Sequence, residues 1–266
     1  MDKKFLTRCN QDNNEVMERC GIYLINLDRS TDRLLSAERH FNAIDLEFER
    51  VVAIDASKEN LSSYSIDREV FQRTHGRANI RAGEIGCYFS HLKALEVFIN
   101  SGKEFGLILE DDVKPESNLL PVLDTLLCWS EDWDIVSLFH FHRGAPIVVR
   151  KGSECSLAVH LAHISSSAAY LVNKKAAMSL LTHLATMRAC VDHSLYNPSE
   201  HRLKLRSCLP MPITLAIEVS QSTINTDSGK KPLIFFRLPT LFNRSYVAIR
   251  IFFSGLEQVF QAWMRP

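Results

Sequence analysis

The apolar run Phe105-Gly106-Leu107-Ile108-Leu109 leads directly into three adjacent carboxylates, Glu110-Asp111-Asp112. A strand that is buried on both faces of an α/β sheet reads as an almost continuous apolar run. The carboxyl end of such a strand is where these sheets place their ligands. The stretch therefore predicts a buried strand that ends in a functional site.

The spacing of the three acids indicates what this site binds. If the strand continues through them, its period of two places Glu110 and Asp112 on one side, about 7 Å apart, and Asp111 on the other. Two like charges at that distance repel each other by about 2 kcal/mol for an effective dielectric constant near 20. A divalent cation such as Mg²⁺ or Mn²⁺, which takes carboxylate and phosphate oxygens as ligands, would convert this repulsion into attraction. The alternative is a solvated turn, or a helix start that Asp111 or Asp112 caps.

Length and composition limit the class of protein. The 266 residues suffice for one large α/β domain, or one domain with an appendage. Lys plus Arg and Asp plus Glu both total 31, so the chain lacks the basic excess that would favour nucleic acid as its main partner.

The cysteines and the apolar runs bear on the cellular compartment. The seven cysteines are odd in number and lack C-x-x-C spacing, which favours reduced thiols in a cytosolic compartment over a disulfide framework. The first twenty residues lack the apolar core of a signal peptide, and no run reaches the roughly 18 apolar residues of a membrane span. We therefore expect a cytoplasmic protein that is neither secreted by that route nor integral to a membrane.

Strand-like and helix-like segments alternate along the chain. A polar stretch, residues 55–82, interrupts them and is predicted to be a long loop with one helical turn. The order of the segments predicts an α/β fold with a mostly parallel sheet flanked by helices. The predicted strands are residues 22–27, 48–54, 105–109, 133–139 and 168–172, and the predicted helices begin after Ser30, near Glu84 and after Asn173.

Four blocks of this sequence resemble the successive motifs of glycosyltransferase family 25, in the family's order and at its spacings. The family contains bacterial lipooligosaccharide galactosyltransferases and collagen glycosyltransferases. The resemblance implies a GT-A-like nucleotide-diphospho-sugar transferase fold, an inverting transfer, and a UDP-sugar donor bound with Mn²⁺ or Mg²⁺. The blocks are Ile22-Tyr23-Leu24-Ile25-Asn26-Leu27-Asp28-Arg29 with Arg33, Gly83-Glu84-Ile85-Gly86-Cys87-Tyr88-Phe89-Ser90-His91-Leu92, Leu107-Ile108-Leu109-Glu110-Asp111-Asp112-Val113, and Ala169-Tyr170-Leu171-Val172 with Val191-Asp192.

The acidic triplet gains a specific role from this resemblance. Transfer of a sugar from a nucleotide diphosphate creates a pyrophosphate leaving group, whose charge a divalent ion stabilises. In GT-A enzymes the last acid of such a triplet usually touches the metal, and the first faces the ribose or the ion. The resemblance therefore assigns Glu110 and Asp112 to the metal, and Asp111 to the sugar or to the fold.

Four polar residues that follow the first strand occupy the place of the nucleotide in a GT-A enzyme. They are Asn26, Asp28, Arg29 and Arg33. A planar guanidinium can hold a phosphate or stack on a base. The alternative is an exposed helix start, in which the acids favour the positive end of the helix and the arginines pair with them.

Three further positions near these blocks are candidates for cofactor or anion binding. Asp55 matches the family's Ala-x-Asp position and can accept hydrogen bonds from the nucleoside, or it forms a simple turn. The Gly83-Glu84-Ile85-Gly86 stretch opens a helix whose backbone N–H groups suit an anion. His91, about two turns inside that helix, either contacts the bound donor, as the resemblance implies, or packs against a neighbour.

An inverting transfer needs a general base for the acceptor hydroxyl, and a carboxylate is the usual choice. Asp192 matches the family's Val-Asp position and is the first candidate, with Glu84 and His193 as rivals. Alternatively, Asp192 caps the next turn. The His140-Phe141-His142 pair is more consistent with a contact to sugar than with a zinc site, because no Cys or carboxylate lies beside it.

The C-terminal segment, residues 228–266, differs from the preceding glycosyltransferase domain (20–227) and the polar N-terminal extension (1–19). It contains six basic residues and one acid, mixed with bulky aromatic side chains. This composition suits a helix lying on an anionic membrane surface, on the inner face of the cytoplasmic membrane. The alternative is a helix packed on the domain or against a second copy.

The sequence therefore predicts an inverting, metal-assisted hexosyltransferase. Its expected partners are a UDP-sugar, most simply UDP-galactose, and an oligosaccharide or lipid-linked saccharide acceptor of lipopolysaccharide. Two other classes stay open: a metal-dependent phosphoryl or nucleotidyl transferase, and a non-catalytic sugar-binding homologue. No Walker-type glycine loop supports the phosphoryl transferase, and the intact acids weigh against an inactive homologue.

Overall fold

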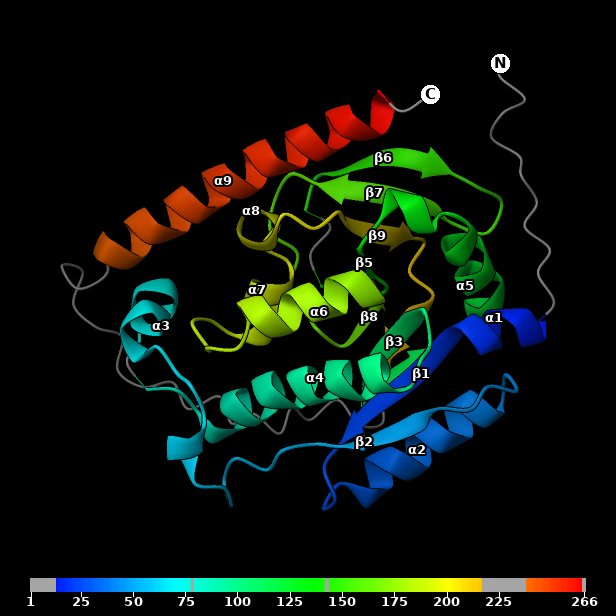
Figure 1. Ribbon diagram of the computed structural model, residues 1–266, viewed down its shortest axis with the longest axis horizontal. Helices are drawn as coiled ribbons and strands as arrows, with labels where there is room; N and C mark the ends of the chain where they lie inside the picture. The colour runs from blue at the N-terminus through cyan, green and yellow to red at the C-terminus, as the bar shows by residue number, and fades with distance from the viewer. Residues whose placement is uncertain (1–12, 78, 142–143, 217–237, 265–266) are drawn as a thin grey trace.

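The computed structural model describes residues 13–77, 79–141, 144–216 and 238–264. Its centre is an eight-stranded sheet in the order β2-β1-β3-β8-β5-β9-β7-β6 (Figure 1). Strands β4 and β10 form a separate two-stranded sheet. The strands are β1 (Cys20–Asn26), β2 (Glu49–Val52), β3 (Phe105–Glu110), β4 (Val113–Pro115), β5 (Ile135–Ser137), β6 (Pro146–Lys151), β7 (Ser156–His160), β8 (Ala169–Asn173), β9 (Leu205–Leu209) and β10 (Ile213–Leu215).

The eight-stranded sheet is mainly parallel. Strands β1, β2 and β3 run parallel to one another, and so do β5 and β9. Strand β8 lies antiparallel between β3 and β5, and β7 lies antiparallel between β9 and β6. Within this sheet only β8 and β7 therefore oppose the common direction. The predicted α/β fold with a mostly parallel sheet is confirmed, and it is compatible with a GT-A-like fold.

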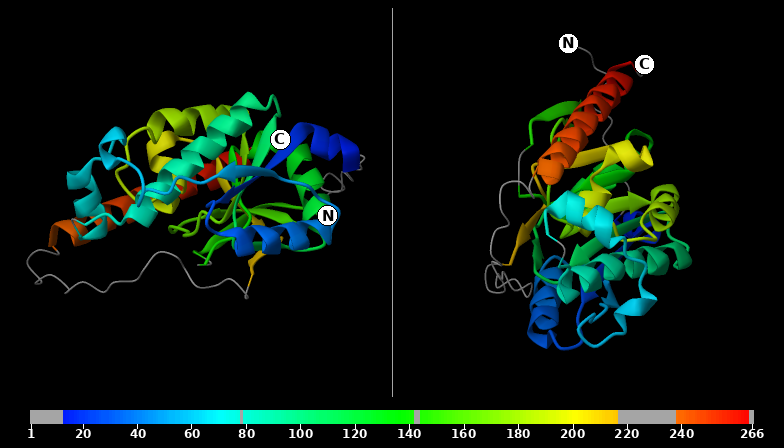
Figure 2. Two further views of the ribbon diagram at one scale, coloured as in Figure 1. Left: turned by 90° about the horizontal axis from the view of Figure 1, so that it is seen from below. Right: turned by 90° about the vertical axis from the view of Figure 1, so that its left-hand side faces the viewer.

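Two apolar cores form because successive side chains of a strand face opposite sides of the sheet. In β3, Leu107 and Leu109 enter one core with Phe41 of α2, whereas Ile108 enters the other with Phe98 of α4. Helices α2 and α4 thus cover opposite faces of the sheet (Figure 2). The first core also takes α1 (Asn13–Arg19), α2 (Thr31–Asn42) and α5 (Leu119–Cys128), and the second takes α3 (Arg68–His75), α4 (Ala82–Asn100), α6 (Lys174–His183) and α7 (Val191–Leu195).

Helix α4 approaches the sheet closely because of a glycine. A Cβ atom on Gly86 would lie 2.5 Å from the carbonyl oxygen of Ile54, just after β2. One turn later, the Ser90 hydroxyl accepts a hydrogen bond of 2.8 Å from the Ile54 backbone N–H. With Gly86 and Ser90 on this side of the helix, Cys87 and His91 face the end of β3.

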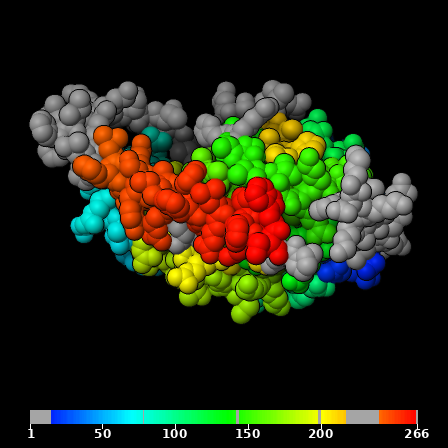
Figure 3. Space-filling view, turned by 90° about the horizontal axis from the view of Figure 1, so that it is seen from above, coloured from blue at the N-terminus to red at the C-terminus, as the bar shows by residue number. Residues whose placement is uncertain are grey.

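The C-terminal helix α9 (Leu238–Trp263) crosses one face of the molecule, where it contacts α3, α8 (Pro198–His201), β6 and β7 (Figure 3). Ile251 and Val259 are buried in this contact, and the buried Gln258 side chain accepts a 3.0 Å hydrogen bond from the Leu205 backbone N–H. The opposite side of α9 exposes many large apolar side chains, together with charged residues such as Arg250 and Glu257. None of the helices in the described residues combines the length and apolarity that crossing a bilayer requires.

The predicted domain boundaries fall partly outside the described residues. Residues 1–12 and 217–237 are among those not described, so the start of the predicted C-terminal segment is not placed. Residues 13–19 of the predicted extension form helix α1.

Candidate active site

The three acids lie at the carboxyl edge of the sheet. Glu110 is the last residue of β3 and pairs in register with Ile25 of the parallel strand β1. Because the strand ends at Glu110, Asp111 and Asp112 belong to the turn before β4 and do not follow the period of a strand. The three side chains nevertheless diverge, Glu110 toward α4 and Asp111 toward α2. The three acids therefore lie at the end of the strand, as predicted, but Asp111 and Asp112 are in a turn, so the strand does not continue through them.

Asp111 is held in a buried network on the α2 side. The Asn26 amide donates a 2.8 Å hydrogen bond to one carboxylate oxygen, and the Arg33 guanidinium donates a 2.9 Å bond to the other. Asn26 in turn accepts a 3.0 Å bond from Arg50, which also forms a 2.7 Å ion pair with Asp28. Both oxygens of the Asp111 carboxylate therefore have hydrogen-bond partners within the protein, which favours a role in the fold over a role in sugar binding.

Glu110 faces the opposite side and contacts α4 and the start of β8. Because β8 is antiparallel to β3, the residues just before it lie at the same edge as the end of β3. Ser167 donates a 2.6 Å hydrogen bond to Glu110 Oε1, and His91 Nε2 lies 3.3 Å from the same oxygen. Burial opposes ionisation of Glu110, but the His91 and Ser167 contacts outweigh it and lower its pKa. The Glu110 side chain is 30% exposed, so the carboxylate remains accessible to a ligand.

Asp112 differs from both neighbours because one of its oxygens has no partner among the described residues. Oδ1 is buried without a hydrogen bond, and Oδ2 lies 3.9 Å from the Arg33 guanidinium. Burial and the nearby charge of Glu110 raise the pKa of Asp112 to about 6. An unsatisfied carboxylate beside a second carboxylate is costly by itself, and a divalent cation would relieve that cost. The arrangement of Glu110 and Asp112 therefore fits Mn²⁺ or Mg²⁺.

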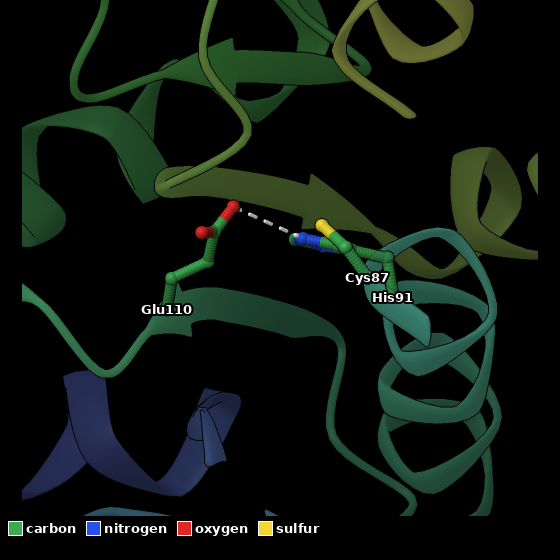
Figure 4. A group of neighbouring side chains, drawn as sticks. All are labelled: Cys87, His91 and Glu110. Atoms are coloured by element: carbon green, nitrogen blue, oxygen red, sulfur yellow. Dashed lines mark hydrogen bonds and ion pairs between the residues drawn. The ribbon is translucent and has the colours of Figure 1, made fainter. Parts of the chain in front are cut away.

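Cys87 is a site residue to which the sequence analysis assigned no role. Its Sγ, a ring nitrogen of His91 and a carboxylate oxygen of Glu110 all lie within 4.8 Å of one another (Figure 4). Burial and the charges of Glu110 and Asp192 raise the pKa of the Cys87 thiol well above its usual range. The available signal was the spacing of four residues between Cys87 and His91, which places both side chains on one face of a helix.

The remaining nucleotide candidates form ion pairs at the edge of the site. Arg29 pairs with Asp55, and Lys58 lies 3.7 Å from the same carboxylate. The Lys58 backbone N–H donates a 2.8 Å hydrogen bond to the Asp55 carbonyl oxygen, which is the turn that the alternative interpretation predicts. The Ser57 hydroxyl also donates a 2.6 Å bond to the Asp55 carboxylate. The Arg29 side chain is 48% exposed, so its guanidinium is accessible to an external anion.

The two carboxylates among the three candidate bases lie in different surroundings. Asp192, in the first turn of α7, is half-buried, and its carboxylate accepts a 2.8 Å hydrogen bond from the His193 backbone N–H. Its charge helps to raise the pKa of the Cys87 thiol. Glu84 caps α4 by accepting a 3.0 Å bond from the Arg81 backbone N–H, and it pairs with Arg77. Glu84 is thus occupied in holding the start of α4.

Five histidines outside this centre form ring contacts with one another. The exposed His193 stacks on His163 at 4.4 Å between ring centroids and meets His75 edge-on at 5.1 Å. His140 is buried, with its ring 5.0 Å from that of His160. His142 lies outside the described residues, so the predicted His-x-His pair is not tested.

Comparison with known proteins gives a family match over this region. The model of a family described as "Glycosyltransferase family 25 (LPS biosynthesis protein)" matches residues 20–195, which is most of the chain and includes all the acids above. A "Glycosyltransferase 25 family member" from Anopheles gambiae is 32% identical over 101 residues, 36% of this chain and 17% of that protein. "Procollagen galactosyltransferase 2" from Homo sapiens is 28% identical over 123 residues, 43% of this chain and 20% of that protein. The matched segments thus span at most a fifth of these two relatives.

Proposed function

Because the chain belongs to glycosyltransferase family 25, we propose that it is an inverting enzyme that transfers galactose from a UDP-sugar to a saccharide acceptor. The name of the human relative, a procollagen galactosyltransferase, supports galactose as the sugar. The description of the family as a lipopolysaccharide biosynthesis protein supports an acceptor of the lipopolysaccharide type. These three finer assignments, donor, sugar and acceptor, are parts of the proposal.

One observation carries the proposed chemistry: Asp112 Oδ1 is buried without a partner among the described residues, and the charge of Glu110 acts on the same carboxylate. Glu110 and Asp112 would hold Mn²⁺ or Mg²⁺. When bound, the ion stabilises the negative charge that develops on the departing diphosphate. Asp111, Asn26 and Arg33 keep the turn in place, so the two ligand carboxylates are already positioned before the donor binds.

The chain's own residues would orient the donor from the β1 side. Arg29 is paired with Asp55 at an exposed position, and exchange of that partner for a phosphate would leave the guanidinium neutralised. Asp55 is then released toward the nucleoside, and Asp28 stays paired with Arg50. His91 lies beside Glu110, where it fixes the orientation of that carboxylate.

Asp192 is the proposed general base for the acceptor hydroxyl. It is only half-buried, has no ion-pair partner within the described residues, and its charge acts on the Cys87 thiol beside Glu110. Glu84 is less suited because the α4 cap and Arg77 already occupy its carboxylate. An inverting transfer then moves the hydroxyl proton to Asp192 as the acceptor oxygen bonds to the sugar and the UDP oxygen departs.

Helix α9 suits an enzyme whose acceptor is lipid-linked. Its outward side carries exposed apolar residues, and residues 228–266 contain six basic residues against one acid. We propose that this side lies on the anionic inner face of the cytoplasmic membrane. The exposed apolar residues are Leu241, Phe242, Tyr246, Ile249, Phe252, Phe253, Leu256, Phe260, Trp263 and Met264.

Incubation of the purified protein with a panel of UDP-sugars and Mn²⁺ tests the proposed function. We expect slow release of UDP from one UDP-hexose in the absence of acceptor. The Asp192→Asn variant should bind the donor normally and lose turnover by about 10²–10⁴-fold. Release of inorganic phosphate or nucleoside monophosphate would instead indicate a phosphoryl or nucleotidyl transferase. Binding without turnover of any sugar nucleotide would indicate a non-catalytic homologue.

A further inference from the structure

Three chemically different donors converge at the end of β3. Cys87 and His91 project from one face of α4, and Glu110 meets them from the strand (Figure 4). Their donor atoms are a sulfur, a ring nitrogen and a carboxylate oxygen, all within 4.8 Å of one another. The Asp112 oxygens are not part of this group. It is therefore distinct from the all-oxygen pair of Glu110 and Asp112, although the two sets share one carboxylate.

We propose that Cys87, His91 and Glu110 form a binding site for a divalent metal ion that prefers sulfur and nitrogen ligands, such as Zn²⁺. Thiolate and imidazole ligands select Zn²⁺ and similar ions, whereas Mg²⁺ and Mn²⁺ prefer oxygen ligands. Binding converts the Cys87 thiol to a thiolate and releases its proton to solvent, so one Zn–S bond replaces one S–H bond. No oxidation or reduction is involved.

The geometry requires little movement. Bonds of about 2.0–2.3 Å from zinc to nitrogen, oxygen and sulfur place tetrahedral donors roughly 3.3–3.7 Å apart. His91 Nε2 and Glu110 Oε1 are already 3.3 Å apart, so the ion would replace the contact that now joins them. Because all three donor atoms lie within 4.8 Å of one another, they need to approach by at most about 1.5 Å to become three ligands, and a water molecule from solvent would take the fourth position.

The surroundings of His91 support a ligand role. A metal-bound histidine usually donates its other ring N–H to a neighbouring oxygen, which fixes the ring. His91 Nδ1 lies 3.2 Å from the hydroxyl of Tyr170, which is fully buried, and the two rings stack at 5.7 Å. His91 itself is 1% exposed. Nε2 is thereby directed at Glu110 and at the position of the ion.

The shared carboxylate gives the site a consequence for activity. An ion held by Cys87, His91 and Glu110 withdraws Glu110 from the Glu110–Asp112 pair. Zinc should therefore inhibit sugar transfer by competing with Mn²⁺. This consequence rests on the proposed function, whereas binding of the ion itself does not.

Titration of the metal-free, reduced protein with Co²⁺, in the absence of nucleotide and Mn²⁺, tests the site directly. We expect one equivalent of Co²⁺ to produce a thiolate-to-cobalt charge-transfer band, which Zn²⁺ then abolishes by displacing the cobalt. The Cys87→Ser variant should lose the band and bind Co²⁺ at least about tenfold more weakly. The matched control is Cys190→Ser, which removes a nearby thiol outside the donor group and should leave the band unchanged.

Several outcomes would overturn the site. One is the absence of a charge-transfer band in the wild-type protein, and another is a band that survives in Cys87→Ser or disappears in Cys190→Ser. If Cys87→Ser does not fold, X-ray absorption of the zinc-loaded wild type provides the test. The proposed site requires one sulfur ligand, and a coordination shell of only nitrogen and oxygen would exclude it. An enzyme that binds Co²⁺ with this band but transfers sugar equally well with added Zn²⁺ would disprove the sharing of Glu110. If the enzyme transfers no sugar with Mn²⁺ even when Zn²⁺ is left out, that result would count against the proposed function and not against the zinc site.

Discussion

Asp111 and Asp112 are neighbours in sequence whose carboxylates meet opposite environments. Asp111 accepts hydrogen bonds from Asn26 and Arg33, so both of its oxygens are satisfied. Asp112 has a buried oxygen without a partner and lies near the charge of Glu110. At the scale of the residue, Asp111 stabilises the fold, and the Asp112 charge is kept at a cost to stability.

Removing each charge in turn should therefore change stability in opposite directions. We expect the free energy of unfolding of Asp112→Asn to equal or exceed that of the wild type, because burial and the charge of Glu110 disfavour the ionised carboxylate. Asp111→Asn should cost about 1–3 kcal/mol, because a partner in the buried network is left unsatisfied. Urea denaturation of both variants at neutral pH measures the difference. Equal losses in the two variants would contradict this division of roles.

A buried histidine away from the site should make stability depend on pH. His201 Nδ1 accepts a 3.3 Å bond from the Leu203 N–H, and Nε2 lies 2.9 Å from the Leu195 carbonyl oxygen, which suits the neutral ring. Burial lowers the pKa of His201 to about 4, from 6.5. The unfolded chain then takes up this proton at a higher pH than the folded one. The contribution of His201 is complete above about pH 6.5 and is lost as the pH falls toward 4.

The loss at pH 5 amounts to about 2 kcal/mol for this one group. In His201→Gln, which keeps a donor and an acceptor, the decrease in unfolding free energy between pH 7.5 and pH 5 should be smaller by about that amount. Urea denaturation of both proteins at the two pH values provides the measurement. An identical decrease in both would show that His201 does not titrate as its burial implies.

At the scale of the element, α4 carries two functions on two sides. Gly86 and Ser90 dock the helix on the chain after β2, and Cys87 and His91 meet Glu110. We expect Gly86→Ala to cost about 1–3 kcal/mol, because the new Cβ would lie 2.5 Å from the Ile54 carbonyl oxygen. The helix must shift, so donor binding should also weaken.

Gly102→Ala provides the contrast for that substitution. Gly102 follows α4 with φ at +80° and has no atom within 4 Å of an added Cβ. An alanine there should cost about 1 kcal/mol through backbone strain and leave donor binding unchanged. Thermal unfolding and UDP titration of both variants separate the two effects. Unaltered UDP binding in Gly86→Ala would show that the docking of α4 does not set the site.

The elements that the sequence predicts well are those whose signals are local. The run 105–109 becomes β3 with one added residue, and Asn173 caps α6 by accepting a 2.8 Å bond from the Ala176 N–H. Strands β7 and β9 were not predicted, because they are short and mix apolar residues with Ser, His and Arg. Their burial depends on pairing with each other and with β5, across long sequence separations.

The same distinction holds for the site. The acidic triplet is visible in sequence because a buried strand makes three adjacent carboxylates conspicuous. The contact of Arg50 with Asn26 depends on the register of β2 with β1, and that of Cys87 with Glu110 depends on the packing of α4. Neither register nor helix packing is encoded in a local pattern, so these partners could not be predicted.

At the scale of the whole molecule, α9 packs on the domain, as one of the two alternatives predicts, and also leaves apolar side chains exposed, to which the membrane proposal applies. One side packs on the domain through Ile251, Gln258 and Val259, which are buried. The other side exposes a continuous apolar face that includes Phe253 and Phe260, at 63% and 62% exposure. Deleting α9 would also uncover the packed side, so point substitutions on the outer face are the cleaner test.

We expect Phe253→Ser with Phe260→Ser to reduce binding to anionic phospholipid vesicles at least about tenfold, because two large apolar side chains no longer enter the interface. Co-sedimentation measures this binding, and added salt should weaken it. Met178→Ser is the control, since Met178 is 56% exposed on α6, away from α9. If the wild-type protein does not bind vesicles and forms a dimer, and the double variant is monomeric, the exposed face binds a second copy instead of a membrane.

The most direct test of the account is a calorimetric titration of UDP into the protein with and without Mn²⁺. We expect one saturable UDP site that requires Mn²⁺ and that weakens at least about tenfold in Asp112→Asn, because Asp112 provides the unpartnered oxygen. Absence of UDP binding with Mn²⁺ present, or equal binding by the wild type and Asp112→Asn, would contradict the assignment of Glu110 and Asp112 to a metal-bound diphosphate.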